Sequence, residues 1–307
     1  MEKVIVVIGP TSVGKTKMGV ALAKKFNGEV ISGDSMQIYK QMDIGTAKVT
    51  EEEKEGIIHH CVDILNPDET YSVHDFQQTV RKKITEITQR GHVPIIVGGT
   101  GLYIKAALYD YQFDEMENDH HAINEKYKDY TNEQLHDHLK SIDEESAKTL
   151  HFNNRRRVLR AIEIYETTGK RKSEMLEEQE HICLYDAYFV GLTLPRDVLY
   201  ERINKRVDVM MENGLKEEMD CLYSQGLTRN HQSMKAIGYK EWFDYYDHQI
   251  DLNDVLELIK KHSRQYAKRQ YTWFKNQFDV HWYDVNLENF EQTIEQVTDD
   301  IEKILKV

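Results

Sequence analysis

Eight consecutive residues near the start of the chain have the types and spacing of a phosphate-binding loop. They read Gly9, Pro10, Thr11, Ser12, Val13, Gly14, Lys15 and Thr16, which is the P-loop pattern G-x-x-x-x-G-K-[ST]. Its glycines allow a tight turn in which backbone N–H groups point into one concavity, and the following helix adds its positive dipole end. Lys15 would reach the outer phosphate, and Thr16 would offer a hydroxyl to Mg²⁺. The loop predicts a site for a di- or triphosphate and leaves open whether that compound is hydrolysed, donates a group or is a leaving group.

Two further polar residues, Asp34 and Thr100, follow short stretches with the pattern of strands. Asp34 comes after residues 29–32, and Thr100 comes after residues 93–97 and two glycines. Ligands of open α/β sheets bind beyond the carboxyl ends of the strands, so both side chains are expected beside the P-loop. Asp34 is either a general base or metal ligand, or only the N-cap of a helix. Its place on the P-loop side of the sheet favours the functional alternative.

An absent acid is also informative. A P-loop hydrolase usually carries an Asp at the end of such a strand to organise Mg²⁺ and water, and this sequence has Gly98 there.

Arg206 lies on a long amphipathic helix expected over residues 196–222. It could reach a phosphate from that helix, or it could be an ordinary exposed arginine.

The elements that must position these residues alternate between strand and helix patterns. Strands are expected over 4–8, 29–32, 93–97 and 186–194, and a capping box at Ser72 and Asp75 opens a helix that Gly91 ends. A short exposed helix is expected near residues 51–53. The tail from residue 279 predicts one more strand-like stretch and a final acidic helix. This pattern predicts an α/β fold with a parallel sheet, formed by residues 1–111 and 183–307.

Residues 112–182 have a different character. They lack strand signals and contain helix-start patterns at Thr131 with Gln134 and at Ser141 with Glu144. We therefore expect an all-helical domain inserted into the core.

The net charge of −13 argues at first against a nucleic-acid partner, but the charge is unevenly distributed. Residues 155–172 contain seven bases and two acids, and residues 260–275 contain six bases and no acid. Each segment could be a solvated helix face or a surface that binds phosphates.

No apolar stretch is long enough to span a membrane, and three scattered cysteines suggest reduced thiols in the cytoplasm. His59, His60 and Cys61 lack a fourth ligand nearby, which favours packing over a metal site.

Taken in order, the motifs resemble those of the bacterial tRNA dimethylallyltransferases. The matching stretches are the P-loop, ISGDSMQIY at 31–39, MDIGTAK at 42–48, His59-His60 with Asp63-Ile64, Tyr71-Ser72-Val73, Gly98-Gly99-Thr100, the helix from Arg157 to Arg160, AIGY at 236–239, and AKRQ at 267–270 with Thr272-Trp273. They cover nearly the whole chain. The resemblance implies a P-loop nucleotidase-like core, dependence on Mg²⁺ held at Thr16, and transfer of a dimethylallyl group from its diphosphate to N6 of adenosine 37 in the tRNA anticodon loop.

The resemblance also implies roles for particular residues. Asp34 would accept the proton of N6, Thr100 would orient a substrate, and Lys15 and Arg206 would stabilise the departing diphosphate. The residues expected to contact tRNA are Asp34, Ser35, Met36, Gln37, Arg156, Arg157, Val158, Leu159 and Arg160. We expect a cytoplasmic monomer. Two rivals stay open at this point: a P-loop small-molecule kinase, and a P-loop RNA-binding module without catalysis.

Overall fold

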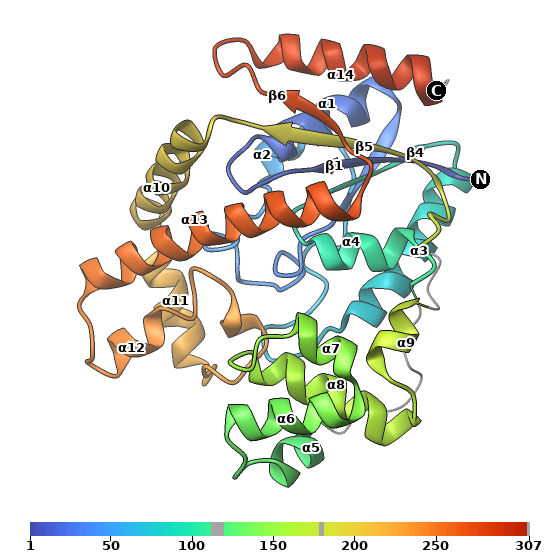
Figure 1. The fold of residues 1–307 in the computed structure, drawn as a ribbon. Coiled ribbons are helices and arrows are strands. Elements are labelled where there is room, and N and C mark those ends of the chain that lie inside the picture. Colours follow the sequence, from blue (N-terminus) through green and yellow to red (C-terminus); the bar gives the residue numbers. More distant parts are fainter. Residues whose placement is uncertain (112–119, 178–180, 306–307) are drawn as a thin grey trace. The chain divides into compact units, whose positions relative to one another are not determined.

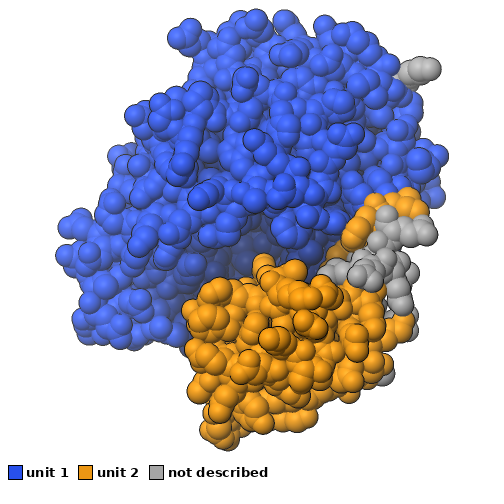
Figure 2. Space-filling view, viewed as in Figure 1, with its two compact units in different colours: residues 1–109, 183–307 blue, residues 110–182 orange. Residues whose placement is uncertain are grey.

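The computed structural model describes residues 1–111, 120–177 and 181–305. The chain divides into two compact units (Figure 2). Unit 1 comprises Met1–Tyr109 and Cys183–Val307, and unit 2 comprises Asp110–Ile182. Tyr109 and Cys183 pair at the two points where the chain leaves and re-enters unit 1. In the described residues no helix is both long and apolar enough to cross a bilayer.

A six-stranded sheet forms the centre of unit 1 (Figure 1). Its strands are β1 (Lys3–Ile8), β2 (Gly28–Ser32), β3 (His59–His60), β4 (Val93–Gly98), β5 (Asp186–Thr193) and β6 (His281–Asp284). Their order is β3-β2-β4-β1-β5-β6, and every pairing is parallel. The predicted α/β class with a parallel sheet is therefore confirmed. Because the strands are parallel, the residues that follow β1, β2 and β4 meet at one edge.

Alternate residues of the central strand β1 supply two cores, one on each face of the sheet. Ile5 and Val7 pack with α1 (Lys15–Lys25) and α14 (Phe290–Leu305), whereas Val4, Val6 and Ile8 face the core of α3 (Val73–Gln89) and α4 (Gly101–Leu108). The long helix α13 (Leu252–Gln277) runs along this second face (Figure 1). The acidic tail thus has a structural role, since α14 buries Val297, Ile301 and Leu305. Each such side chain contributes roughly 1.5–3 kcal/mol.

Unit 2 contains only helices among its described residues. They are α5 (His120–Lys126), α6 (Asn132–Ile142), α7 (Glu144–Thr149), α8 (Arg155–Thr168) and α9 (Lys172–Glu177). The two ends of the predicted insertion, residues 112–119 and 178–180, lie outside the described residues. Unit 2 has its own core, in which Leu135, Leu139, Val158 and Ile162 are fully buried.

Three local predictions were wrong. The helix expected over 196–222 is two helices, α10 (Arg196–Glu212) and α11 (Leu215–Ser224), because Gly214 adopts a φ of 97° between them. Ser141 lies inside α6, and Asp143 caps α7 by accepting a hydrogen bond from the backbone N–H of Ser146. No strand was expected between residues 40 and 70, where the structure has the edge strand β3.

His59 and His60 form that edge strand, and His60 has a structural partner. Its Nε2 lies 2.6 Å from Oε2 of Glu29, which also receives hydrogen bonds from Arg90 and His92. Burial alone would raise the pKa of Glu29, but the hydrogen bonds from Arg90, His60 and His92 lower it to about 2. The remaining elements of unit 1 are α2 (Glu51–Lys54), a short 3-10 helix (Ser233–Lys235) and α12 (Trp242–Tyr246).

Candidate active site

The P-loop connects β1 directly to α1, as its pattern requires. Gly9 has a φ of 147°, and a Cβ there would lie 2.6 Å from the carbonyl oxygen of Leu192 in β5, so only glycine fits. Gly14 begins the helix at a φ of 107° and lies against the ring of Phe290. With Lys15 at the first helical position, the free N–H groups of α1 are available to an anion.

A cavity of about 320 Å³ opens beside this loop, entirely within unit 1. Its polar lining includes Thr11 and Ser12 of the P-loop, Asp34 and Ser35 after β2, and Arg206, Tyr266 and Arg269 from α10 and α13. Its apolar lining includes Ile203, Val207, Met210, Ala236, Ile237 and Ile259. The hydroxyl of Ser12 is buried and makes no hydrogen bond with any described residue. A buried polar group without a partner is costly, so this hydroxyl marks a place for a polar ligand.

Asp34 and Thr100 lie at the same end of the sheet, as the strand order predicts. Oδ1 of Asp34 accepts a hydrogen bond of 2.8 Å from the backbone N–H of Met36. Oγ1 of Thr100 accepts one of 3.2 Å from the backbone N–H of Ser35, and so joins the turn after β4 to the turn after β2. Asp34 also lines the cavity. No helix begins at Asp34, so the N-cap alternative does not describe it.

Arg206 lines the cavity together with Asp34, and Lys15 of the P-loop lies near enough to both for their charges to act on its pKa. Nζ of Lys15 donates a hydrogen bond of 2.8 Å to the carbonyl of Pro10. Burial lowers the pKa of Lys15 to about 7, with Arg206 acting in the same direction and Asp34 against it. Burial also lowers the pKa of Arg206, and the charges of Glu53 and Asp34 oppose this shift. The guanidinium of Arg206 nevertheless stays charged, because arginine is not deprotonated in proteins. Two partly desolvated cations with one carboxylate suit a ligand with several negative charges.

Sequence reasoning missed two residues of this site, Gln270 and Tyr266, both on α13. Oε1 of Gln270 accepts a hydrogen bond of 3.0 Å from the backbone N–H of Thr11, and its Nε2 donates one of 3.0 Å to the carbonyl of Gly99. The buried amide of Gln270 therefore ties the P-loop to the glycine turn. The hydroxyl of Tyr266 donates to the carbonyl of Gly99 at 3.3 Å, and burial together with Asp34 raises the pKa of Tyr266 to about 12. The motif AKRQ at 267–270 was the available signal.

Among the residues that follow Asp34, Ser35 and Met36 line the cavity, whereas Gln37 has bonds within the protein. Nε2 of Gln37 donates to the carbonyls of Thr46 and Ala47 at 3.4 and 3.2 Å, and its Oε1 accepts from Oγ of Ser32 at 3.3 Å. Gln37 is thus placed to hold the cavity wall.

The arginines of α8 differ in their surroundings within unit 2. Arg155 donates to the carbonyls of Tyr127 and Tyr130, and Arg160 pairs with the buried Glu163 at 2.8 Å. Arg156 and Arg157 are exposed. Val158 and Leu159 belong to the core of unit 2. Of the five residues expected on this helix to contact RNA, the structure leaves Arg156 and Arg157 most accessible.

The oxygen donors near the P-loop fit a magnesium ion that is held mainly by its substrate. In the described part of the chain, no three His, Cys, Asp or Glu side chains come together as metal ligands would. Mg²⁺ needs few protein ligands when phosphate oxygens and water complete its octahedron. The hydroxyl of Thr16, at the start of α1, would be such a ligand, and the buried Ser12 hydroxyl of the same loop also lacks a partner among the described residues.

Comparison with known proteins assigns this architecture to a family. The family model described as IPP transferase matches residues 37–277. A protein of Bacillus cereus strain AH187, named tRNA dimethylallyltransferase, is 54% identical over 287 residues, which cover 92% of this chain and 90% of the relative. The relative of the same name from Bacillus anthracis is 54% identical, with 92% and 91% covered.

Two solved structures agree with this result. The tRNA delta(2)-isopentenylpyrophosphate transferase of Staphylococcus epidermidis is 47% identical, with a TM-score of 0.74 and 99% of each chain covered. A eukaryotic dimethylallyltransferase, described as acting on tRNA, is 33% identical with a TM-score of 0.86. The match covers 99% of this chain and 79% of the eukaryotic chain. With a family model that matches most of its length and relatives of this identity, the chain belongs to the IPP transferase family.

Proposed function

We propose that this protein transfers a dimethylallyl group from dimethylallyl diphosphate to N6 of adenosine 37 in the anticodon loop of tRNA, and releases diphosphate. One observation carries the proposal. A single cavity joins Thr11 and Ser12 of the P-loop and the cation Arg206 to the carboxylate of Asp34 and an apolar wall, with the buried Lys15 on the same loop, in a chain whose relatives are named for this activity. The residues offer one place for a diphosphate, one for a short hydrocarbon and one for a proton.

The leaving group is the diphosphate. In the transfer, N6 attacks the first carbon of the dimethylallyl group while the bond from that carbon to the diphosphate oxygen breaks. The P-loop N–H groups, Lys15 and Arg206 would stabilise the charge that collects on the leaving oxygen. A magnesium ion bound at Thr16 would add Lewis-acid stabilisation of the diphosphate. Gly98 in place of a hydrolase acid is consistent with a site that does not activate water.

The acceptor is a weakly nucleophilic aromatic amine, so its proton must be removed as the new bond forms. Asp34 would accept this proton on its carboxylate. Thr100 would fix the turn that carries Asp34 through its bond to Ser35. The apolar wall formed by α10, with Ile203, Val207 and Met210, would hold the hydrocarbon and exclude water. The base must leave the loop stack to reach this cavity, which costs a few kcal/mol and is cheapest for a single-stranded base.

Two basic regions would hold the RNA backbone. On α13, Lys268 and Arg269 line a groove of about 500 Å³ together with Thr272 and Trp273. In unit 2, Arg156 and Arg157 are exposed at the start of α8. We expect the protein to act in the cytoplasm as a monomer.

The test is incubation with labelled dimethylallyl diphosphate and unmodified tRNA, in the presence of Mg²⁺ and without ATP. Label in the RNA supports the proposal. A small-molecule kinase would need ATP and would leave the RNA unlabelled, and a P-loop module without catalysis would bind ligands without turnover. Either result would contradict the proposed function.

Replacing Arg156 and Arg157 with Ala should weaken tRNA binding and lower the slope of log affinity against log salt. Each lost phosphate contact is expected to reduce that slope by about 0.7–0.9. Filter binding at several salt concentrations measures the effect. The matched control is Lys148→Ala, an exposed base of unit 2 that already pairs with Glu145 at 2.7 Å. Equal slopes for the double variant and the control would remove these arginines from the interface.

A further inference from the structure

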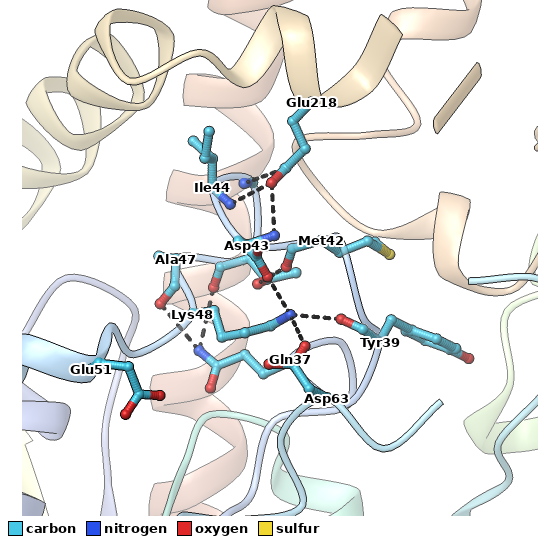
Figure 3. A network of polar contacts seen from close by, with 12 residues as sticks. Gln37, Tyr39, Met42, Asp43, Ile44, Ala47, Lys48, Glu51, Asp63 and Glu218 are labelled. Carbon is cyan, nitrogen blue, oxygen red and sulfur yellow. Dashed lines mark hydrogen bonds and ion pairs between the residues drawn. The ribbon is translucent and has the colours of Figure 1, made fainter. Parts of the chain in front are cut away.

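One carboxylate outside the cavity collects an unusual number of donors from the chain. Glu218, on α11, accepts hydrogen bonds from three successive backbone N–H groups, those of Asp43, Ile44 and Gly45, at 2.7, 2.8 and 3.0 Å. The hydroxyl of Tyr239 adds a fourth at 2.6 Å. Figure 3 shows Glu218 above the turn with its bonds to these N–H groups. Successive N–H groups that converge form an anion-binding nest, and here the anion is the protein's own carboxylate.

Tyr239 fixes the same turn from another side. Its fully buried ring lies against Gly45, where a Cβ would come within 2.5 Å of the ring. Gly238, with a φ of 98°, lies against the carbonyl of Gly45. Two sequence-distant stretches, 43–47 and 235–240, therefore meet at Gly45, and both line the cavity. Glu218 holds one of them through backbone N–H groups and the other through a phenol.

The turn is also held from below by a buried cation. Nζ of Lys48 donates to the carbonyl of Tyr39 at 2.7 Å and to Oδ1 of Asp43 and of Asp63 at 2.5 Å each (Figure 3). The backbone N–H of Lys48 donates to the carbonyl of Asp43 at 2.9 Å. Lys48 thus joins the turn to Tyr39 and Asp63, whereas Glu218 joins it to α11.

A series of hydrogen bonds connects this turn to the reacting carboxylate. The carbonyls of Thr46 and Ala47 accept from Nε2 of Gln37, whose Oε1 accepts from Oγ of Ser32. Oγ of Ser32 in turn accepts from the backbone N–H of Asp34 at 3.4 Å. Each of these bonds is long and weak alone, so their geometry depends on a fixed turn at one end.

We propose that Glu218 is a positioning residue for the transfer: its carboxylate fills the nest at residues 43–45, joins that turn to Tyr239, and so sets the cavity wall and Asp34 relative to the acceptor base. This inference rests on the proposed function. It assigns no chemical step to Glu218, which does not line the cavity.

The test compares Glu218→Gln with Glu217→Gln, an exposed neighbour on the same helix that loses the same charge. A glutamine at 218 offers one acceptor oxygen and turns an NH₂ group toward backbone N–H donors. For Glu218→Gln we expect kcat/KM for tRNA to fall by about 10–100-fold, since misplacement by about 1 Å can cost about 100-fold. The Kd for inorganic diphosphate should stay within about twofold, because the P-loop is held by other contacts. Glu217→Gln should match the wild type.

Two further measurements separate positioning from folding. Hydrogen exchange of the amides of residues 43–45, without any substrate, should become faster in Glu218→Gln only. Rates are taken at a temperature at which circular dichroism shows every variant folded, so that a loss of kcat cannot reflect unfolded protein. If Glu218→Gln does not fold, Tyr239→Phe carries the test, with an expected loss of about 3–10-fold for removal of one donor.

Unchanged kcat/KM in the folded Glu218→Gln protein, or an equal loss of diphosphate binding, would overturn the inference. Faster exchange without a kinetic effect would overturn it as well, since the nest would then be only structural. A wild-type protein that binds diphosphate but transfers nothing would contradict the proposed function itself, and with it the role of Glu218 in transfer. The exchange rates would still show separately whether the carboxylate of Glu218 holds the turn at residues 43–45.

Discussion

Replacement of Asp34 with Asn is expected to lower kcat for prenyl transfer by about 10²–10⁴-fold, the range of a lost general base. The amide keeps an oxygen for the backbone N–H of Met36, so the turn after β2 is preserved. It cannot take the proton of N6. Affinity for tRNA and for inorganic diphosphate should stay within a few-fold, because the P-loop and the basic surfaces are unchanged. Single-turnover transfer and filter binding measure the two effects separately.

Asp68→Asn is the control for this substitution, since Asp68 is an exposed acid of unit 1 without a recorded hydrogen bond. It should behave as the wild type. The Asp34→Ala variant gives the decisive limit: transfer within a factor of ten of the wild type would exclude Asp34 as the base.

Replacement of Lys15 with Met should lower kcat/KM by about 10²–10³-fold, the typical cost of losing one group that stabilises a developing negative charge. The substitution should also remove the part of the pH dependence of diphosphate binding that comes from protonation of Lys15. Burial and Arg206 lower the pKa of Lys15 to about 7, so the free protein loses this charge as pH rises from 6 to 8. A bound diphosphate favours the charged form and raises the pKa again. Wild-type affinity should therefore be greatest below pH 7 and weaken by up to about tenfold per pH unit above it.

Calorimetry at pH 8 in two buffers of different ionisation enthalpy measures the proton uptake that this linkage requires. We expect uptake of nearly one proton by the wild type in excess of that seen with Lys15→Met, whose value reports the protonation of diphosphate alone. Lys17→Met is the matched control, because Lys17 lies on the same helix, is exposed and pairs with Glu291. Identical uptake by wild type and Lys15→Met would show that Lys15 does not change its protonation state on binding, and would contradict this linkage.

Short-range sequence patterns define the parts of the site that were correctly placed at one end of the sheet. The P-loop needs eight consecutive residues, and Asp34 and Thr100 were located because each directly follows a strand that local composition predicts. Whether these residues have the proposed roles stays a prediction. Gln270 could not be placed in this way, since it meets Thr11 across 259 residues of sequence. Helical periodicity on α13 shows that a residue faces inward, but it does not name the loop that it faces.

Other differences have similar physical causes. The break between α10 and α11 escaped prediction because the apolar spacing continues through Leu215, and only the left-handed backbone of Gly214 ends the first helix. The strand β3 has two residues, too few for a period to be recognised. Glu218 is one acid among several on an amphipathic helix, and the three amides that it binds are backbone groups with no signature in the sequence.

The strand order has a consequence for how the protein is made. The central strand β1 lies between β4 and β5, which are separated by the whole of unit 2 in the sequence, and the edge strand β6 begins only at His281. During synthesis the first-made strand must therefore wait for residues 186–193 before its second neighbour exists, whereas unit 2 has local contacts and a core of its own. Non-local pairing of this kind slows folding. The helices of unit 2 can thus fold during synthesis before β5, which carries Leu192, pairs with β1. The P-loop is therefore synthesised first but completed as a binding site late.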